Sequence, residues 1–344
     1  MLVHTILDER LGMSESKAMK LLISTFVTLL LIGSAGSSYG QEFEETKLLA
    51  EQGDVRAQNN LGLMYDNGDG VPKNYAEAVK WYRLAAEQGY AYAQSNLGQM
   101  YSFGDGVPEN DAEAVKWYRL AAEQGYARAQ YLLGVKYSFG DGVPENDAEA
   151  VKWYRLAAEQ GYARAQFSLG VMYERGDGVP ENKAEAVKWF RLAAEQGNAN
   201  AQSNLGAMYS FGDGVPENKA EAVKWFRLAA EQGNANAQSN LGAMYSFGDG
   251  VPENKAEAVK WFRLAAEQGN ANAQNNLGSM YANGEGVPQN NIRAYAWFSV
   301  AAAQGNEIAR DSRNRVSEGL APTQLGQAQQ IATKCFESDY QDCE

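Results

Sequence analysis

Apolar and polar positions alternate along most of this chain in a pattern that returns every 36 residues. Within each period, two blocks carry apolar residues at intervals of three and four, the spacing that places them on one face of an α-helix. The second block of the first period shows this stripe most fully, in Ala78, Val79, Trp81, Tyr82, Ala85 and Ala86. We therefore predict two helices per period, folded back on each other as a helical hairpin.

Aligning the periods shows seven copies of the consensus A-x-A-Q-x-x-L-G-x-M-Y, G-D-G-V-P-x-N and E-A-V-K-W-[YF]-R-L-A-A-E-Q-G. A single hairpin cannot bury its apolar face, so neighbouring copies must stack and the two ends need caps. We therefore predict one elongated all-α solenoid rather than several globular domains. The copies occupy residues 54–89, 90–125, 126–161, 162–197, 198–233, 234–269 and 270–305.

The glycine-rich loop between the two blocks is interpreted as a turn. Gly68 suits the left-handed conformation that ends a helix, and Gly70 permits a tight turn. Asn74 and Glu77 form a capping box for the helix that follows. A calcium loop needs oxygen ligands at alternating positions, whereas the alternating positions after Asp66 are glycines. We predict no metal ion and no cofactor.

Both ends of the repeat array resemble single helices of the repeat. Residues 41–53 contain KLLAEQG, close to the RLAAEQG of the second block, and are predicted to form an N-terminal capping helix. Residues 306–344 are predicted to hold C-terminal capping helices and a tail. One helix over 306–318 ends at Gly319, and another begins at Pro322 and runs to about Phe336.

Residues 1–40 are interpreted as a signal peptide with an upstream extension. Lys20 precedes an apolar run over residues 21–32, and small residues lead to a predicted cleavage near Gly40. The run is too short to span a bilayer, so we predict no integral membrane span after processing. A membrane anchor or a buried helix is the alternative. The expected destination is the periplasm or the outside of the cell.

Charge and residue chemistry exclude several classes of function. The formal net charge is -13, and no basic segment offers the surface that nucleic acid or an anionic membrane would need. The single histidine, His4, precedes the predicted cleavage site, so a processed chain has no histidine for acid–base catalysis or an ordinary zinc site. Cys335 and Cys343 are predicted to form a disulfide in an oxidising compartment, with two free thiols as the alternative.

The copies resemble Sel1-like repeats, a branch of the tetratricopeptide-type helical repeats. The resemblance rests on A-x-A-Q-x-x-L-G-x-x-Y, G-x-G-V-x-x-[DN] and A-x-x-W-[YF]-x-x-A-A-x-x-G, and it covers residues 54–305. It implies a right-handed α-solenoid of seven hairpins whose concave groove holds a protein or peptide. Some cysteine-rich exported members have been associated with β-lactam binding or hydrolysis. Those members carry paired cysteines in every repeat, which this chain lacks.

Comparison of the copies separates positions that serve the fold from positions free to serve a partner. In the first block of copy one, Ala57, Leu61 and Tyr65 keep their identity in all seven copies. The variable positions are Arg56, Asn59, Asn60, Leu63 and Asn67. On a helical wheel the two sets lie on opposite sides. We therefore expect the constant side to pack between hairpins and the variable side to be exposed, lining the groove that the resemblance implies.

The variable face changes character along the array. Copies three and four offer aromatic and aliphatic side chains, whereas copies five and six offer small and amide ones. We hypothesise that partner binding centres on copies three and four. The alternative is that these side chains only pack against adjoining helices. The predicted protein-binding residues are Arg56, Asn60, Leu63, Asn96, Gln99, Arg128, Tyr131, Leu132, Val135, Arg164, Phe167, Val171 and Asn204.

Two other recurring features are assigned to structure. The tryptophans at the position of Trp81 are predicted to be core residues rather than a carbohydrate-stacking row. Glu77, Lys80, Arg83 and Glu87 are spaced for intrahelical ion pairs on a solvated face.

The functional prediction is an exported scaffold or adaptor that binds a protein or peptide, acting as a monomer and not as an enzyme. The first alternative is an envelope-acting hydrolase of the β-lactamase-associated Sel1 type. Its support is weak, because the one Ser-x-x-Lys match, Ser14 to Lys17, lies in the segment predicted to be removed. The second alternative is a periplasmic regulator of a membrane sensor.

Overall fold

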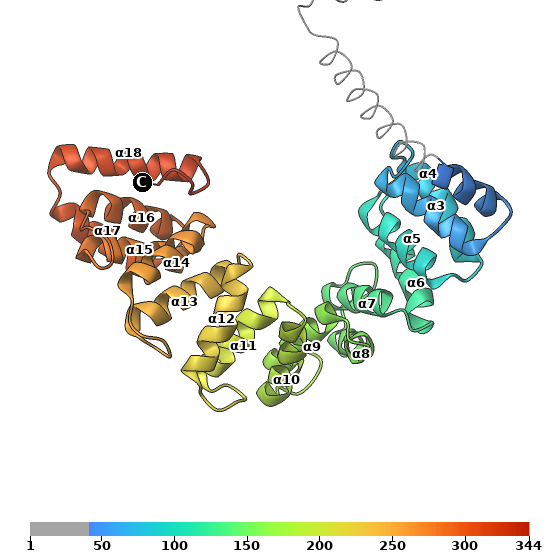
Figure 1. The fold of residues 1–344 in the computed structure, drawn as a ribbon, viewed down its shortest axis with the longest axis horizontal. Helices are drawn as coiled ribbons and strands as arrows, with labels where there is room; N and C mark the ends of the chain where they lie inside the picture. The colour runs from blue at the N-terminus through green and yellow to red at the C-terminus, as the bar shows by residue number, and fades with distance from the viewer. Residues whose placement is uncertain (1–40, 344) are drawn as a thin grey trace, which may run out of the picture. The chain divides into compact units, whose positions relative to one another are not determined.

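The protein is described by a computed structural model that covers residues 41–343. These residues form helices joined by turns and contain no strand, as the sequence predicts (Figure 1). They divide into two compact units, one ending at Glu145 and the other beginning at Asn146. The division falls between the two helices of the third copy. The predicted signal peptide lies outside the described residues.

The first unit contains a helical segment over residues 41–51 and the first five helices of the repeats. Within this unit the first and second helices of the repeats alternate, and each packs against the helix that follows it in the chain. The helices are α3 (Val55–Asn67), α4 (Tyr75–Glu87), α5 (Ala91–Phe103), α6 (Asp111–Glu123) and α7 (Ala127–Phe139).

The second unit continues the same alternation and ends in two capping helices. Its helices are α8 (Asp147–Glu159), α9 (Ala163–Arg175), α10 (Lys183–Glu195), α11 (Ala199–Phe211), α12 (Lys219–Glu231), α13 (Ala235–Phe247), α14 (Lys255–Glu267), α15 (Ala271–Asn283), α16 (Asn291–Ala303), α17 (Glu307–Glu318) and α18 (Pro322–Glu337). The helices predicted at the C-terminal end are therefore present, with Asn306 and Gly319 as the caps of α17.

Local capping sets the helix boundaries, although the predicted capping box is only half formed, because the Asn74 amide donates to the Tyr65 carbonyl oxygen (2.8 Å) and not to the Glu77 side chain. The Asn74 side chain accepts a hydrogen bond from the Glu77 amide at the start of α4. Gly68 ends α3 with φ +85°, and its amide donates to the Met64 carbonyl. These contacts satisfy backbone groups that a helix end would otherwise leave unpaired, so the hairpin is encoded locally.

The invariant Leu-Gly pair of the first helix builds the hairpin core. Leu97 on α5 is fully buried, and a Cβ atom on Gly98 would lie 2.7 Å from Cε1 of Tyr118 on α6. The missing side chain of the glycine is what lets the aromatic ring of the second helix pack against the first. Phe190 packs against Gly170 in the same way in the second unit.

The glycine-rich loop is a turn, as predicted, and it also makes a contact between repeats. Gly106 has φ +70°, and a Cβ atom there would lie 2.7 Å from the Ala76 amide nitrogen, at the start of the second helix of the preceding copy. Backbone therefore meets backbone at this point. The second glycine of the loop is needed for stacking as well as for the turn.

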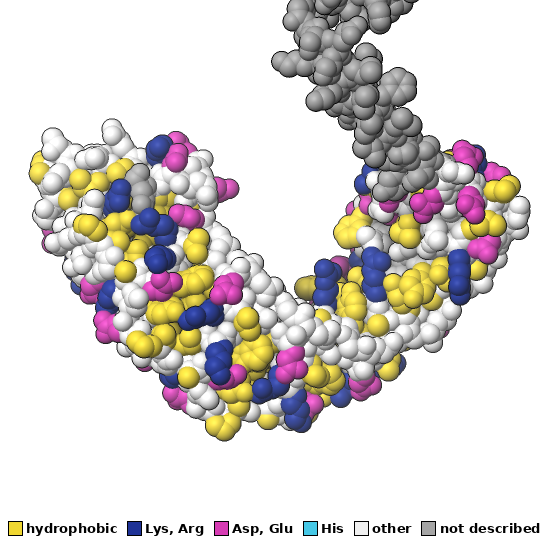
Figure 2. Space-filling model, viewed as in Figure 1, with side chains coloured by type: hydrophobic (Ala, Val, Ile, Leu, Met, Phe, Trp, Pro, Cys, Tyr) yellow, Lys and Arg dark blue, Asp and Glu magenta, His cyan; other side chains and the backbone are white. Residues whose placement is uncertain are grey.

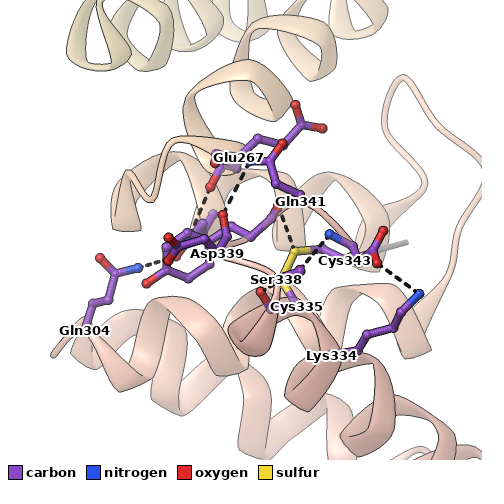
Figure 3. Close-up of a disulfide and its surroundings, with 12 residues drawn as sticks. Glu267, Gln304, Lys334, Cys335, Ser338, Asp339, Gln341 and Cys343 are labelled. Atoms are coloured by element: carbon purple, nitrogen blue, oxygen red, sulfur yellow. Dashed lines mark hydrogen bonds and ion pairs between the residues drawn. A yellow bond between two sulfur atoms is a disulfide. The ribbon is translucent and has the colours of Figure 1, made fainter.

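The C-terminal end is closed by the predicted disulfide (Figure 3). Cys335 and Cys343 are bonded to each other and are both buried in the last core cluster. The tail between them turns back on the sixth copy, where Gln341 donates to the Glu267 carbonyl oxygen (2.9 Å) and the Tyr340 ring lies over Gly269. At the other end, Phe43 of the capping segment packs edge-on against Tyr65.

The recurring tryptophans lie in or against the core clusters, as predicted. Trp153 and Trp297 are buried, while Trp81, Trp117 and Trp225 are half-buried and pack against buried residues. Within residues 41–343, no helix combines the length and the apolar character needed to cross a membrane.

Candidate functional site

In the first unit, side chains of the variable face form one hydrogen-bond network. Arg128 on α7 donates through Nη1 to Asn96 Oδ1 (3.3 Å) and through Nη2 to Gln99 Oε1, both on α5. Asn96 donates to Asn59 Oδ1 on α3 (3.2 Å), and Asn59 Nδ2 lies 3.4 Å from Asn60 Oδ1. The network brings together Asn60, Asn96, Gln99 and Arg128 from three successive first helices.

An aromatic stack lies at the start of the same helices. The ring centroids of Tyr90 and Tyr92 are 5.3 Å apart, and those of Tyr92 and Tyr126 are 4.6 Å apart. Tyr92 remains 52% exposed although it touches both neighbours. Two neighbouring rings hold the Tyr92 side chain in one orientation in the free protein. Its apolar surface would therefore lose little side-chain entropy on binding a partner.

Two buried phenols lie within the electrostatic reach of Arg128. Burial raises the pKa of Tyr82, and the nearby Asp66 carboxylate, which accepts a hydrogen bond from the Tyr82 hydroxyl (3.2 Å), raises this pKa further. Burial also raises the pKa of Tyr118. The positive charge of Arg128 opposes both shifts. The guanidinium is held by the neutral side-chain amides of Asn96 and Gln99, within electrostatic range of the two phenols.

The other predicted residues of the first unit lie on the same three helices. Arg56 and Leu63 are exposed, whereas Tyr131, Leu132 and Val135 are half-buried. The face shown in Figure 2 intersperses basic and acidic side chains with hydrophobic ones.

From the fifth copy on, asparagines take the place of these tyrosines and form a ladder. Asn198 caps α11 by accepting from the Ala201 amide. Its counterpart Asn234 caps α13 in the same way, and its Nδ2 also donates to Asn200 Oδ1 of the preceding copy (2.9 Å). Asn270 and Asn306 make the same contact with the preceding copy, so these amides link consecutive first helices from α11 to α17. These contacts within the chain engage Asn200 and Asn236, the counterparts of Arg128, which the sequence interpretation did not foresee.

The predicted residues of copies four and five are not equally accessible. Arg164 is exposed, and Asn204 is half-buried. Phe167 and Val171 are half-buried and pack against the core cluster of the second unit, with the Phe167 and Phe190 rings 5.8 Å apart. Their packing role is therefore visible in the structure, and a role in binding stays a prediction.

One expectation about the variable face is wrong. Asn59 is only 5% exposed, and its counterparts Ser95, Ser203 and Ser239 are also buried. This position points toward the neighbouring hairpin rather than toward solvent. The residue at this position therefore affects how neighbouring hairpins pack, and copies three and four have a tyrosine or a phenylalanine where these copies have a small side chain.

The expected intrahelical pairing is right for one pair and wrong for Arg83. Lys80 does pair with Glu77. Arg83 instead donates to the hydroxyl of Tyr101 in the next copy (2.7 Å), and Arg155 donates to Tyr173 in the same way (2.6 Å). The signal was present in the sequence, because the arginine and the tyrosine recur at a constant separation of 18 residues.

A second contact that the sequence interpretation missed involves the invariant glutamines. Gln94 Nε2 donates to the Ala86 carbonyl of the preceding copy (3.1 Å), and Gln94 Oε1 accepts from Gln124 (2.7 Å). Gln94 is buried, so its constancy reflects a hydrogen bond between repeats. In the described part of the chain, no three His, Cys, Asp or Glu side chains gather as a metal site would require.

Fold and surface together define an all-α repeat solenoid with a polar and aromatic face. A family model for the Sel1 repeat matches seven successive segments of the chain, and the chain belongs to the Sel1 repeat family. Proteins of this family generally mediate protein–protein interactions. The matched segments are residues 55–90, 91–126, 127–162, 163–198, 199–234, 235–270 and 271–306.

Solved structures of Sel1 repeat proteins are similar to this chain. A Sel1 repeat protein from Oxalobacter formigenes is 40% identical, with a TM-score of 0.64 and coverage of 82% of this chain and 81% of its own. A protective antigen present in uropathogenic Escherichia coli strains, with an SLR fold, is 33% identical, with a TM-score of 0.43 and coverage of 89% and 81%. A search of curated proteins found no match.

Proposed function

We propose that this chain is an exported adaptor that binds a protein or peptide partner through the variable face of its first helices. The observation that carries the proposal is the network in which Arg128 is held by Asn96 and Gln99, close in sequence to the stacked Tyr92 and Tyr126. Arginine and tyrosine side chains are the residues that most often dominate binding energy at protein interfaces, and both are preorganised here.

The arrangement of helices supports binding on this side. In the second unit α11 lies beside α13, whereas α12 and α14 approach one another less closely. In a stack of hairpins, the more closely spaced helices lie on the inner side of the curve. The proposal accordingly places the partner on the first helices of the repeats.

Export is proposed from the leader-like sequence of residues 1–40 and is supported by the disulfide. Disulfides persist in oxidising compartments such as the periplasm. Mass spectrometry of the protein recovered from bacterial periplasm tests this step. We expect a mature N-terminus at Gln41, and recovery of the full-length chain in the cytoplasm would contradict export.

Site-specific photo-crosslinking in cells tests the binding face. A photoreactive residue at Asn60 or Leu63 is expected to capture a protein that mass spectrometry identifies, because both side chains are exposed on α3. The matched control is Lys80, which is exposed on α4. Capture of the same protein from Lys80 with equal yield would contradict the proposal. With the partner in hand, Arg128→Ala should weaken binding about tenfold, as expected for an interface anchor.

A further inference from the structure

Exposed phenylalanines stand at the ends of the first helices. Phe103 and Phe139 in the first unit are 67% and 70% exposed, and Phe211 and Phe247 in the second unit are each 74% exposed. Each ring directly precedes the glycine that opens the loop. Large apolar side chains this exposed are a feature of interaction surfaces when they recur along one edge.

In the second unit these rings already have a cationic partner. Lys219 Nζ lies 5.6 Å from the centroid of the Phe211 ring, and Lys255 Nζ lies 5.7 Å from that of Phe247. Lys219 is held in place by the Ser210 carbonyl oxygen, 2.6 Å from its Nζ. The distances are those of cation–π contacts, so the copies of the second unit supply their own cation to the exposed ring.

In the first unit a carboxylate takes the place of that lysine. Asp111 is the counterpart of Lys219, and its Oδ1 accepts a hydrogen bond from the Ser102 hydroxyl (3.3 Å), as Lys219 contacts Ser210. Among the described residues, no lysine or arginine lies over the ring of Phe103 or Phe139. The aromatic edge is thus repeated in the first unit without its cation.

The loop carboxylates follow the same division. In the second unit Asp213 pairs with Lys183 (2.8 Å) and Glu217 lies 3.7 Å from Lys219. Their counterparts in the first unit, Asp105 and Glu109, make no ion pair within residues 41–145.

The basic side chains at this edge of the first unit are already engaged. Lys136 is buried and bonded to Asp111, and its Nζ lies 3.8 Å from Asp141. Lys73 lies over the Tyr75 ring, 4.4 Å from the centroid, and is influenced by the charge of Asp105. The edge therefore combines open aromatic rings with an excess of carboxylates.

We propose that the edge formed by Phe103, Phe139 and their loop carboxylates binds a basic segment of a partner protein. A lysine or arginine of that segment would lie over the Phe103 ring, as Lys219 lies over the Phe211 ring in the second unit. Apolar residues on either side of this cation would cover the exposed phenylalanine rings. Charge complementarity selects this occupant, since the rings and carboxylates together attract a cation and repel an acidic peptide. This surface is separate from the Arg128 network and goes beyond the proposed function.

Fluorescence anisotropy with the full chain tests the proposal. The probe is a fluorescein-labelled octapeptide of alternating lysine and leucine, at roughly physiological ionic strength so that long-range attraction is screened. Phe103→Ala with Phe139→Ala should weaken binding about tenfold, because two cation–π contacts and their apolar cover are lost. The matched pair, Phe211→Ala with Phe247→Ala, should change the affinity less than about twofold, since those rings hold their own lysines.

A second variant tests the cation directly. In the double variant Asp111→Lys with Lys136→Met, each substitution introduces the residue found at the same position of the fifth and sixth copies. The chain should therefore keep its helical signal and melting temperature. We expect it to lose peptide binding about tenfold, because an internal lysine then occupies the Phe103 ring. Equal weakening by both phenylalanine pairs, unchanged binding in the first pair, or equal binding of a glutamate–leucine peptide would overturn the proposal.

Discussion

Lys136 Nζ lies 2.5 Å from Asp111 Oδ1, which joins the first helix of the third copy to the second helix of the second copy. Lys136 is 9% exposed and stands where the other six copies have methionine. A buried ion pair is weak evidence for stability, because desolvation of the two charges offsets their attraction. Its two partners should therefore respond differently to substitution.

Asp111→Ala is expected to destabilise the first unit by about 3 kcal/mol, because it leaves the Lys136 charge buried without its main partner. Lys136→Met is expected to be neutral or stabilising, because it restores the methionine of the other copies. Asp111 would still accept the hydrogen bond from Ser102 and remain in contact with solvent. Thermal unfolding followed by circular dichroism measures both. Similar losses in the two variants would contradict this account.

Glycine substitutions separate backbone strain from loss of stacking. Gly125→Ala should cost about 1 kcal/mol, since φ is +87° and a Cβ atom there meets nothing within 4 Å. Gly106→Ala has a similar φ of +70° but would also drive a Cβ atom into the backbone of Tyr75 and Ala76. We expect a cost of about 3 kcal/mol or more. Equal costs, measured by urea unfolding, would show that the loop glycine serves the turn alone.

The buried phenols predict a loss of stability in alkali. The pKa of Tyr82 and of Tyr118 is raised above the ordinary value of 10.0, mainly by burial, so the folded chain keeps protons that the unfolded chain releases. Stability is then fully present below about pH 10 and falls as the pH rises through and above that value. Tyr82→Phe with Tyr118→Phe copies the phenylalanine of the later repeats.

Melting temperatures between about pH 8 and pH 11 measure this effect, and the double variant should lose less stability over the range than the parent chain does. The quantity to compare is the slope of melting temperature against pH. Loss of the Tyr82–Asp66 hydrogen bond changes the melting temperature of the variant by a similar amount at every pH and so leaves this slope unaffected. Parallel slopes would contradict the assignment of the alkaline loss to these two phenols.

The disulfide is expected to hold the C-terminal cap. Replacing Cys335 and Cys343 by serine removes a link with a sequence separation of 8 residues, which should cost about 2.5 kcal/mol on the loop-entropy estimate. The loss should appear as faster amide hydrogen exchange in α18 and at Gln341, with the first unit unchanged. The control is Lys334→Ala, which breaks an exposed ion pair to Asp342 and should cost about 0.5 kcal/mol or less. Equal exchange in the two variants would contradict the capping role.

Most of the fold follows from residues that are close in the sequence. The helices begin at asparagines such as Asn74 and end beside glycines such as Gly68, because those side chains and conformations satisfy the backbone locally. Repetition adds the stacking, since an apolar stripe present seven times has only its neighbours to pack against. The helical hairpins and the helices at both ends of the repeat array were predictable for this reason.

The surface was predictable only in part. Asn60, Asn96, Gln99 and Arg128 were recognised as one variable face, but nothing in the helical period indicates that the side chains of Asn96 and Gln99 bind Arg128. The same face was expected to include Asn59, which the structure buries. A helical wheel assigns residues to the sides of one helix. Burial of a side chain also depends on the angle and distance at which the next hairpin packs against that helix.

The sequence by itself determined the repeat, its helices and their ends, because these depend on hydrogen bonds and apolar spacing within a few residues. Only the tertiary structure decided that Arg83 binds Tyr101, that Gln94 links two copies and that Phe103 lacks the lysine that Phe211 has. Those contacts join residues brought together by stacking, so their geometry exists only once the hairpins have packed.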